Sequence, residues 1–580
     1  MALQESSGTG QDPGRDRWPP QIKYIVGNEA AERFSYYGMK GILAVYITVA
    51  LKKTQDEATT IIHLFGFANY FMPLLGAWVS DRWWGRYHTI LWISLFYCAG
   101  HGVLAMSDLF PAVDAKLLCL YVGLGLIAFG AGGIKPCVSA FMGDQFRADQ
   151  GHLMRKAYMA FYFSINFGSF FSFIVIPWIA GKPELLAADA GFLDRVLWQF
   201  KHAGFTGYGW AFGVPGILMA LATLVFWLGT KHYVRRPPNK ETRTAGFFSV
   251  FLTAFRHLPK GNTGLTVTAM VSVLTCIVCP LVLMLGMVYV GLHHKHTPTV
   301  QFIGWGSVAC LGFWYVLVVG ASVLNKTELP EQFWAGARSR FGEGEIAAAR
   351  SVAPILAVLA LVPAFWALFE QSNSTWVLQA VKMEPFTLLS FKIGPEQMQS
   401  LNPLLVMILI SALNWGIYPL LEARGLRVTA LRRMAAGLVF TALSYVVVGW
   451  LQSRIEAKES LSLAWQAVPY VILTTGEVLI STTGLEFAYT QAAPSMKSTI
   501  MSCWLLTVAI GNLFVTTITQ LLSDQGAPGV AVAEGEASVS SGRFYLYAGL
   551  TAVVSVLFII VAACYRYRDT PPSLPDVVSH

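Results

Sequence analysis

Charged side chains interrupt the first long apolar stretch of the chain, between residues 29 and 40. This segment reads EAAERFSYYGMK, so carboxylates, cations and tyrosines fall where a membrane helix is otherwise apolar. A charge at the centre of a membrane helix costs at least about 2.5 to 3.5 kcal/mol, so several together indicate a function. At about 100° per residue, the ionisable side chains fall within roughly 140° of one helix face. These side chains are Glu29, Glu32, Arg33, Tyr36, Tyr37 and Lys40.

We expect this face to line protein or a water-filled cavity, where carboxylates and amines can exchange protons. The alternative is a charged helix face packed against a soluble partner. The apolar run extends well past the motif in a chain full of similar runs, which favours a membrane helix.

A few further ionisable side chains lie inside apolar segments, and each is a candidate functional group. Lys135 follows a run of glycines, which permit close packing of helices. Glu370 and Glu477 lie in apolar segments of the second part of the chain. His63 precedes Tyr70 by seven residues and shares its helix face, although a lone membrane histidine is often a hydrogen-bonded packing residue.

The division of these charges along the chain suits alternating access. Ion pairs between two lobes can hold one mouth closed, and protonation of a carboxylate releases its cation. Each proton that moves inward gains roughly 2.3 kcal/mol per 100 mV of membrane potential. Aromatic and amide side chains that we expect beside the charges would give apolar walls with polar handles, suited to a zwitterion with variable side chains. They are Tyr36, Tyr37, Tyr70, Asn166, Trp366, Asn402 and Trp504.

Composition identifies the class of protein. The chain is 55% apolar and 13% charged, with a mean hydropathy of +0.53, whereas a typical soluble domain is about 25% charged. This predicts an all-α polytopic membrane protein embedded in a lipid bilayer. The net charge of +8 does not indicate nucleic acid, because the basic residues sit in short loops between apolar segments. Cys276 and Cys279 form a CxxC within an apolar run, which favours buried thiols over a metal site.

Apolar segments recur along the whole chain and predict fourteen spans. If the N-terminus is cytoplasmic, the cytoplasmic segments hold about 26 of the 41 Lys and Arg residues, which predicts cytoplasmic termini. The predicted spans are 24–50, 60–80, 88–107, 118–142, 157–180, 210–229, 264–291, 302–324, 352–378, 401–421, 431–451, 466–491, 498–521 and 543–565.

The first six and last six spans have nearly equal extent, as in the parallel six-helix halves of major-facilitator transporters. We therefore expect six-helix bundles at 24–230 and 351–566. Residues 231–350 would hold a basic linker, two extra membrane helices and a cytoplasmic amphipathic helix at 326–350. Residues 1–23 and 567–580 would be cytoplasmic tails, and no cleavable signal peptide is visible.

Several motifs together resemble the proton-dependent oligopeptide transporter (POT or PTR) family of the major facilitator superfamily, bacterial type. The matching stretches run in order over about 29–504, nearly the whole chain. They are ExxERFxYYGM at 29–39, GGIKPCVSAF at 132–141, FYFSINFGS at 161–169, FWALFEQ at 365–371 and GEV through TGLEF at 476–487. The loop with Gly76, Asp81, Arg82, Gly85 and Arg86 resembles the superfamily signature between helices 2 and 3.

This resemblance implies uptake of di- and tripeptides with protons across the bacterial inner membrane, with the proton gradient as driving force and no cofactor or metal. It implies no oligomeric state. Lys135 would pair with Glu477 and attend the peptide carboxylate, while Glu477 would meet the amino terminus. The implied proton-coupling residues are Glu29, Glu32, Arg33, His63 and Glu370. The implied substrate-binding residues are Tyr36, Tyr37, Lys40, Tyr70, Lys135, Asn166, Trp366, Asn402, Glu477 and Trp504.

Other functions remain open at this point. A related carrier would move nitrate, an amino acid or another small solute, but a pocket with both Lys135 and Glu477 favours a zwitterion. A membrane enzyme would need a metal cluster, nucleophile elbow or phosphate loop, and the sequence shows none of these motifs. A receptor or scaffold would leave the charges of the 29–40 segment unexplained.

One departure from the family yields a prediction. Lys40 stands where the family usually has Arg, at a position expected to pair with Glu370 and to contact the peptide carboxylate. Lysine keeps the charge but lacks the two parallel donors of a guanidinium. We expect Lys40→Arg to leave proton coupling intact and to tighten peptide binding in a competition assay. An unchanged peptide affinity would remove this role for Lys40.

Overall fold

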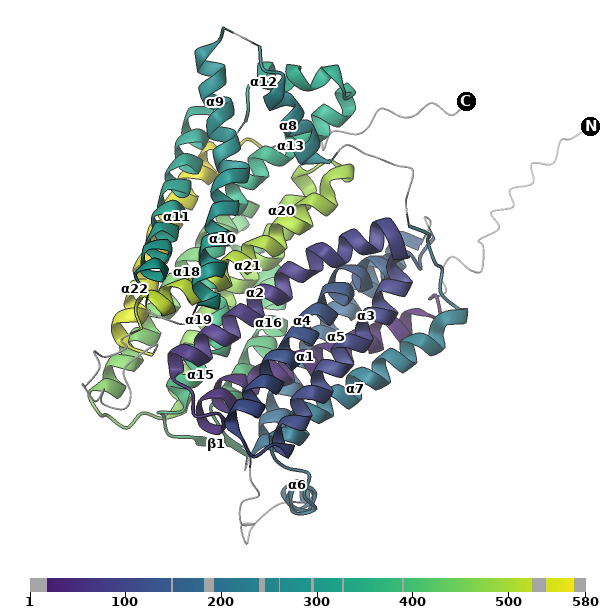
Figure 1. Cartoon of the computed structure of the whole chain (residues 1–580), viewed down its shortest axis with the longest axis vertical. Helices are drawn as coiled ribbons and strands as arrows, with labels where there is room; N and C mark the ends of the chain where they lie inside the picture. Colours follow the sequence, from purple (N-terminus) through teal and green to yellow (C-terminus); the bar gives the residue numbers. More distant parts are fainter. Residues whose placement is uncertain are drawn as a thin grey trace, which may run out of the picture.

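Helices form almost the whole molecule. The structure, a computed structural model, describes residues 18–147, 150–181, 192–238, 246–259, 261–293, 297–325, 328–388, 391–523 and 539–567. Within these ranges it contains long apolar helices and one short β-hairpin (Figure 1). The predicted all-α class of a polytopic membrane protein is therefore confirmed.

The first group of helices packs into what we call the N-terminal bundle. In it, α1 lies between α5 and α7, while α4 packs against α2 and α3. A short helix, α6 (Phe192–His202), joins α5 to α7. The helices of this bundle are α1 (Ile22–Val45), α2 (Gln55–Val79), α3 (Gly85–Ala105), α4 (Val113–Gly143), α5 (Gly151–Ala180) and α7 (Tyr208–Leu228).

The last helices form a C-terminal bundle in which α18 packs against α19 and α22, and α14 packs against α21. The hairpin β1 (Phe386–Leu388) and β2 (Phe391–Ile393) follows α15. The helices of this bundle are α13 (Glu343–Leu359), α14 (Pro363–Phe369), α15 (Thr375–Ala380), α16 (Leu401–Ala412), α17 (Tyr418–Ala423), α18 (Ala430–Glu456), α19 (Ala467–Glu477), α20 (Thr483–Gln491), α21 (Lys497–Leu521) and α22 (Ser541–Cys564).

The two extra membrane segments lie against the C-terminal bundle (Figure 1). They comprise α9 (Thr263–Val273) with α10 (Cys279–Leu292), and α11 (Pro298–Asn325). Close packing depends on glycine, since a Cβ on Gly304 of α11 would lie 2.6 Å from Leu521 Cδ2 on α21. The helical hairpin formed by α9, α10 and α11 thus belongs structurally to the C-terminal bundle.

A single helix was expected at 326–350, just before the C-terminal bundle. The structure instead divides the described part of this segment among α12 (Glu331–Ala335), a 3₁₀ turn and the start of α13. The connection from residue 231 to α13 also contains α8 (Phe247–Arg256), and α13 already begins at Glu343. The Glu345 side chain stabilises this start, because it accepts a hydrogen bond from the Gly342 N–H over 3.1 Å. Residues 326 and 327 lie outside the described residues.

Each of the fourteen predicted spans falls on helix. By length and apolar composition, 11 helices among the described residues are able to cross a membrane, or up to 12 with a bent pair counted as one span. One of these runs, Gln55–Leu109, holds both α2 and α3. The charged α1 is not among the 11, so the count of fourteen and the cytoplasmic termini stay predictions.

The bundles are tied together near the end that the charge count predicts to be extracellular, which we call the predicted outer end. Asp56 Oδ1 at the start of α2 lies 2.9 Å from Arg543 Nη1 at the start of α22. Gln399 Nε2 donates to the Gly41 carbonyl of α1 over 2.9 Å. The helix α6 and the β-hairpin lie at this end, whereas α8 and α12 lie at the opposite end (Figure 1).

Helix regularity fails beside the candidate charges. Glu370 begins a 3₁₀ turn between α14 and α15, just after a 46° bend before Pro363. Proline at the first helical position fits such a restart, because its missing N–H is not needed there. A π-helical segment, Val478–Thr482, directly follows Glu477. Such segments are often found at functional sites.

Glycines of α2 and α4 permit the tightest helix contact near the candidate site, which leads to a prediction. A Cβ on Gly76 would lie 1.9 Å from the Gly132 carbonyl oxygen, a backbone atom that cannot turn away. We expect Gly76→Ala to destabilise the protein by about 1 to 3 kcal/mol, measured as a lower unfolding midpoint in detergent. Gly102→Ala is the control, since a Cβ there meets nothing within 4 Å. Equal midpoints for both variants would contradict the packing argument.

Candidate transport site

The charged segment of α1 forms a buried acid–base cluster. Arg33 Nε lies 2.7 Å from Glu29 Oε1 and 3.0 Å from Glu32 Oε2. Glu29 is 2% exposed and Glu32 is fully buried. One guanidinium thus faces two carboxylates, so the cluster carries a net negative charge when both are ionised. Protonation of one carboxylate neutralises it, which is the chemistry expected of a proton-coupling group.

An ion pair joins α1 to the C-terminal bundle. Lys40 Nζ lies 2.6 Å from Glu370 Oε2, and both side chains are 3% exposed. Burial of two charges is costly unless they pair well, so loss of either partner would leave an uncompensated charge. This is the pairing that the family resemblance implies, and it connects the two bundles directly.

Lys135 on α4 is held by aromatic rings in place of an acid. Its Nζ atom is buried without a hydrogen-bond partner. It lies 4.2 Å from the ring centre of Tyr36 and 4.7 Å from that of Tyr70. Cation–π attraction offsets part of the cost of burying the charge. The ammonium therefore keeps three donors available for a ligand carboxylate.

Glu477 bonds within its own bundle, so the expected Lys135–Glu477 pair is not formed in this structure. Glu477 Oε2 accepts a hydrogen bond from Asn402 Nδ2 over 2.5 Å. The same amide nitrogen lies 3.2 Å from Thr474 Oγ1. An amide donor from α16 thus satisfies the acid while the lysine faces tyrosines of the N-terminal bundle.

These groups nevertheless share one electrostatic environment. Lys135 interacts with Glu32 and Arg33 of α1 and with Glu370 of the C-terminal bundle. Tyr37 on α1 interacts with Arg33 and also with Glu477. Charges from the two bundles therefore act on each other, as an alternating-access site requires.

His63 bridges the bundles at the centre of α2. It is fully buried, with Nδ1 2.8 Å from Asn512 Oδ1 and Nε2 2.9 Å from Ser374 Oγ. Asn512 Nδ2 donates to the Val508 carbonyl, which directs Oδ1 toward the imidazole. The neutral ring then carries its proton on Nδ1 and accepts the Ser374 hydroxyl at Nε2.

The remaining predicted residues occupy several of the same helices. Trp366 of α14 and Trp504 of α21 are buried and meet edge to face at 6.1 Å between ring centres. Tyr36 and Tyr37 meet in the same manner at 5.2 Å. Asn166 of α5 is buried, and its amide donates to the Tyr162 carbonyl of its own helix. Among the described residues, Asn166 forms no hydrogen bond or ion pair with the charged groups.

Sequence reasoning missed several polar partners. Asn69 donates to the Tyr36 hydroxyl over 2.7 Å, and Asn512 and Ser374 bind His63. Asn69 and Asn512 are polar residues within apolar runs, which is a usable signal, whereas Ser374 lies in the polar stretch EQSNST at 370–375. Which residue bonds to Tyr36 or His63 depends on tertiary packing, and the amino-acid sequence alone does not specify that packing.

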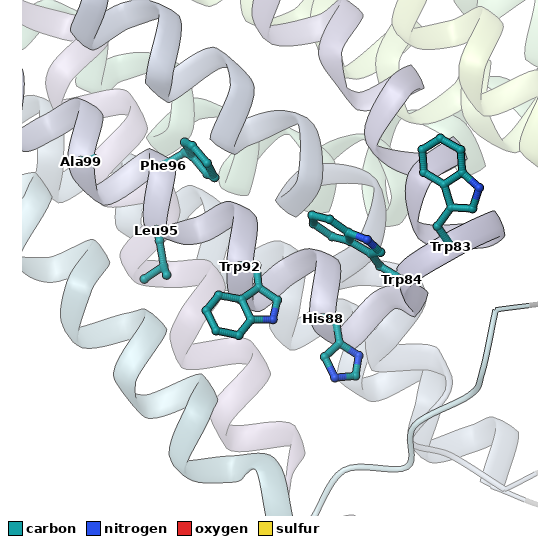
Figure 2. Close-up of a pocket in the computed structure, with 7 residues that line it drawn as sticks. All are labelled: Trp83, Trp84, His88, Trp92, Leu95, Phe96 and Ala99. Atoms are coloured by element: carbon teal, nitrogen blue, oxygen red, sulfur yellow. The ribbon is translucent and has the colours of Figure 1, made fainter.

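Neither a metal cluster nor the surface pocket adds to this site. Among the described residues, no group of three His, Cys, Asp or Glu side chains is placed to hold a metal ion. A pocket of about 880 Å³ is lined by Trp83 and Trp84, which directly precede α3, and by residues of α3 such as Trp92 (Figure 2). It shares no residue with the charged groups, and its lining is typical of a lipid-facing surface.

Comparison with known proteins decides the family. A model described as PTR2, POT family, matches residues 87–304 and 321–531. The chain belongs to the POT family. It is 32% identical to mouse solute carrier family 15 member 2 over 475 residues, 80% of this chain and 54% of that protein. It is 34% identical to Caenorhabditis elegans peptide transporter family 2 over 438 residues, 75% of this chain and 47% of that protein.

Solved structures of the family share the fold. A crystal structure of an auto-inhibited POT family peptide transporter is 37% identical, with a TM-score of 0.74 and coverage of 96% of this chain and 99% of that one. A second POT family transporter, solved in meso, is also 37% identical, with a TM-score of 0.75 and coverage of 95% and 99%. This chain spans about half the length of the curated relatives it matches.

The ion pair between the bundles yields a prediction. Lys40→Met or Glu370→Gln alone leaves a buried unpaired charge, and we expect each to destabilise the protein by about 3 to 5 kcal/mol. The double variant should recover much of this loss, because no charge remains unpaired. Arg338→Gln is the control, since its exposed pair with Glu343 contributes about 0 to 1 kcal/mol. Additive losses in the double variant, measured by thermal unfolding, would contradict a direct buried pair.

Proposed function

We propose that this protein carries di- and tripeptides together with protons into the cell by alternating access. The observation that carries the proposal is the buried set of opposite charges shared by two helical bundles and bridged by Lys40 and Glu370. Family membership supports a carrier over an enzyme. Relatives described as peptide transporters support peptides as the substrate class.

The two ends of a peptide have complementary groups in the site. Lys135 presents an ammonium without a hydrogen-bond partner, which suits the peptide carboxylate. Glu477 presents a carboxylate on the opposite bundle, which suits the peptide amino group. Tyr36, Tyr37 and Tyr70 would contact the peptide from the first bundle. Asn166, Trp366, Asn402 and Trp504 would complete walls that tolerate varied side chains.

Proton coupling would act through the buried pairs. Protonation of Glu370 removes the charge that holds Lys40 and so weakens the tie between the bundles. The Glu29, Glu32 and Arg33 cluster would bind a proton beside the substrate. Protonated His63 would carry a second N–H, and the Ser374 hydroxyl would have to turn from donor to acceptor.

The fold and the distribution of charges also support a proposal for the membrane location, the driving force and the boundaries of the two halves. The protein would lie in the bacterial inner membrane, use the proton gradient and need no cofactor. The halves would be residues 24–230 and 351–566, with the hairpin of α9–α11 attached to the second. Uptake of another small solute such as an amino acid or nitrate is the alternative, and paired binding groups of opposite charge favour the peptide.

The decisive experiment measures uptake of labelled dialanine into proteoliposomes with and without an inward proton gradient. Accumulation only with the gradient is expected from a symporter. Accumulation that is independent of the gradient would exclude symport. Nitrate and free amino acids, offered as competitors in excess, should not reduce dialanine uptake, and strong inhibition by either would favour the alternative substrate.

Glu32 yields a separate prediction for coupling. We expect Glu32→Gln to reduce gradient-driven accumulation at least about 100-fold while sparing dialanine counterflow, because the amide cannot bind and release the proton. Glu331→Gln is the matched control, since that carboxylate is 70% exposed. Driven uptake at the wild-type level in Glu32→Gln would exclude Glu32 as a required coupling group.

A further inference from the structure

Two buried polar side chains lie on α3, beside Glu32 of α1. Tyr97 and His101 are one helical turn apart and fully buried. Their ring centres are 5.3 Å apart. Both ring nitrogens of His101 lack a side-chain hydrogen-bond partner, while the Phe212 backbone of α7 interacts with the ring. A neutral imidazole carries one N–H and one acceptor nitrogen, so one ring nitrogen is free to take a proton.

The pair is continuous with the acid–base cluster of α1. The Tyr97 hydroxyl faces the carboxylate of Glu32. Neither oxygen of Glu32 has a hydrogen-bond partner, although Arg33 Nε lies 3.0 Å from one of them. Glu32, the Tyr97 hydroxyl and His101 therefore follow one another from α1 to α3, with the ring centres of Tyr97 and His101 5.3 Å apart.

Glycines on the neighbouring helices make room for both side chains. A Cβ on Gly130 of α4 would lie 2.6 Å from Tyr97 Cβ, and one on Gly216 of α7 would lie 2.8 Å from His101 Cβ. The ionisable groups facing the pair are Glu32, Arg33 and Tyr36 of α1 and Cys98 of α3. From α7 the Phe212 backbone faces His101. The polar pair is thus enclosed by protein and open toward Glu32.

We propose that His101 is a further proton-accepting residue of the transport cycle, connected to Glu32 through the hydroxyl of Tyr97. This inference rests on the proposed function. The protonated carboxyl of Glu32 donates to the Tyr97 oxygen while the Tyr97 hydroxyl donates to a ring nitrogen of His101. The carboxyl loses one proton, the imidazole gains one and the phenol is unchanged. The proton is then held inside the N-terminal bundle, apart from the peptide.

The test compares the pH dependence of gradient-driven dialanine uptake in wild type, His101→Gln and Tyr97→Phe. Glutamine fills similar space but cannot take the proton, and phenylalanine removes only the hydroxyl. We expect driven uptake to fall about 5-fold or more in both variants and its midpoint pH to move by about half a unit or more. Counterflow should stay at the wild-type rate. His88→Gln, an exposed histidine on the same helix, is the control.

Wild-type driven uptake tests the proposed function, whereas the variant profiles test this inference alone. Normal counterflow by Tyr97→Phe shows a folded carrier even if His101→Gln proves unstable. A pH profile and driven rate in Tyr97→Phe identical to those of wild type and His88→Gln would overturn the proposed connection. A wild-type profile in folded His101→Gln would overturn His101 as the acceptor.

Discussion

The pairing of buried charges is the constraint on which the rest of the structure depends. Glu29, Glu32, Lys40 and Glu370 are almost completely buried in a protein that crosses a membrane. Such charges persist only when each has a partner or an aromatic surface. The contact of 2.6 Å between Lys40 and Glu370 satisfies both partners, and it also holds α1 against the second bundle. The ion pair of Lys40 and Glu370 therefore couples the charge state of these residues to the contact between the two bundles.

The helices are built to admit these charges. Glu370 lies at a break between α14 and α15, and Glu477 precedes a π-helical segment. Both interruptions turn a side chain out of the regular helical pattern at membrane depth, which is tolerated where backbone is buried in protein. Glycines of α4 let α2 and α3 approach closely enough to seal the N-terminal bundle around Lys135. Two helix interruptions and a set of close glycine contacts thus lie beside the buried charges.

The sequence predicted much of this arrangement, and its failures have physical causes. Helical periodicity identified the charged face of α1, and apolar runs located every predicted span on helix. The short helix α6, the β-hairpin and the early start of α13 were missed because local capping and turns decide them. The Lys135–Glu477 pair was expected from resemblance, yet Glu477 bonds Asn402. Linear patterns identify buried polar residues but do not select among possible partners.

The most direct test of the central claim measures the separation of the two bundles at the predicted outer end. It asks whether this separation grows when the buried carboxylates lose their charge. Ala112 and Ala457 are exposed positions in loops at that end of the two bundles. Spin labels on Ala112→Cys and Ala457→Cys would report the distance between the bundles by pulsed electron paramagnetic resonance. The labels would be placed in a variant without reactive native cysteines. The account predicts a short distance at about pH 8, and a growing population of longer distances toward about pH 5 or when Glu370→Gln removes the charge that holds Lys40. A distance distribution that is the same at both pH values, and unchanged by Glu370→Gln, would contradict it.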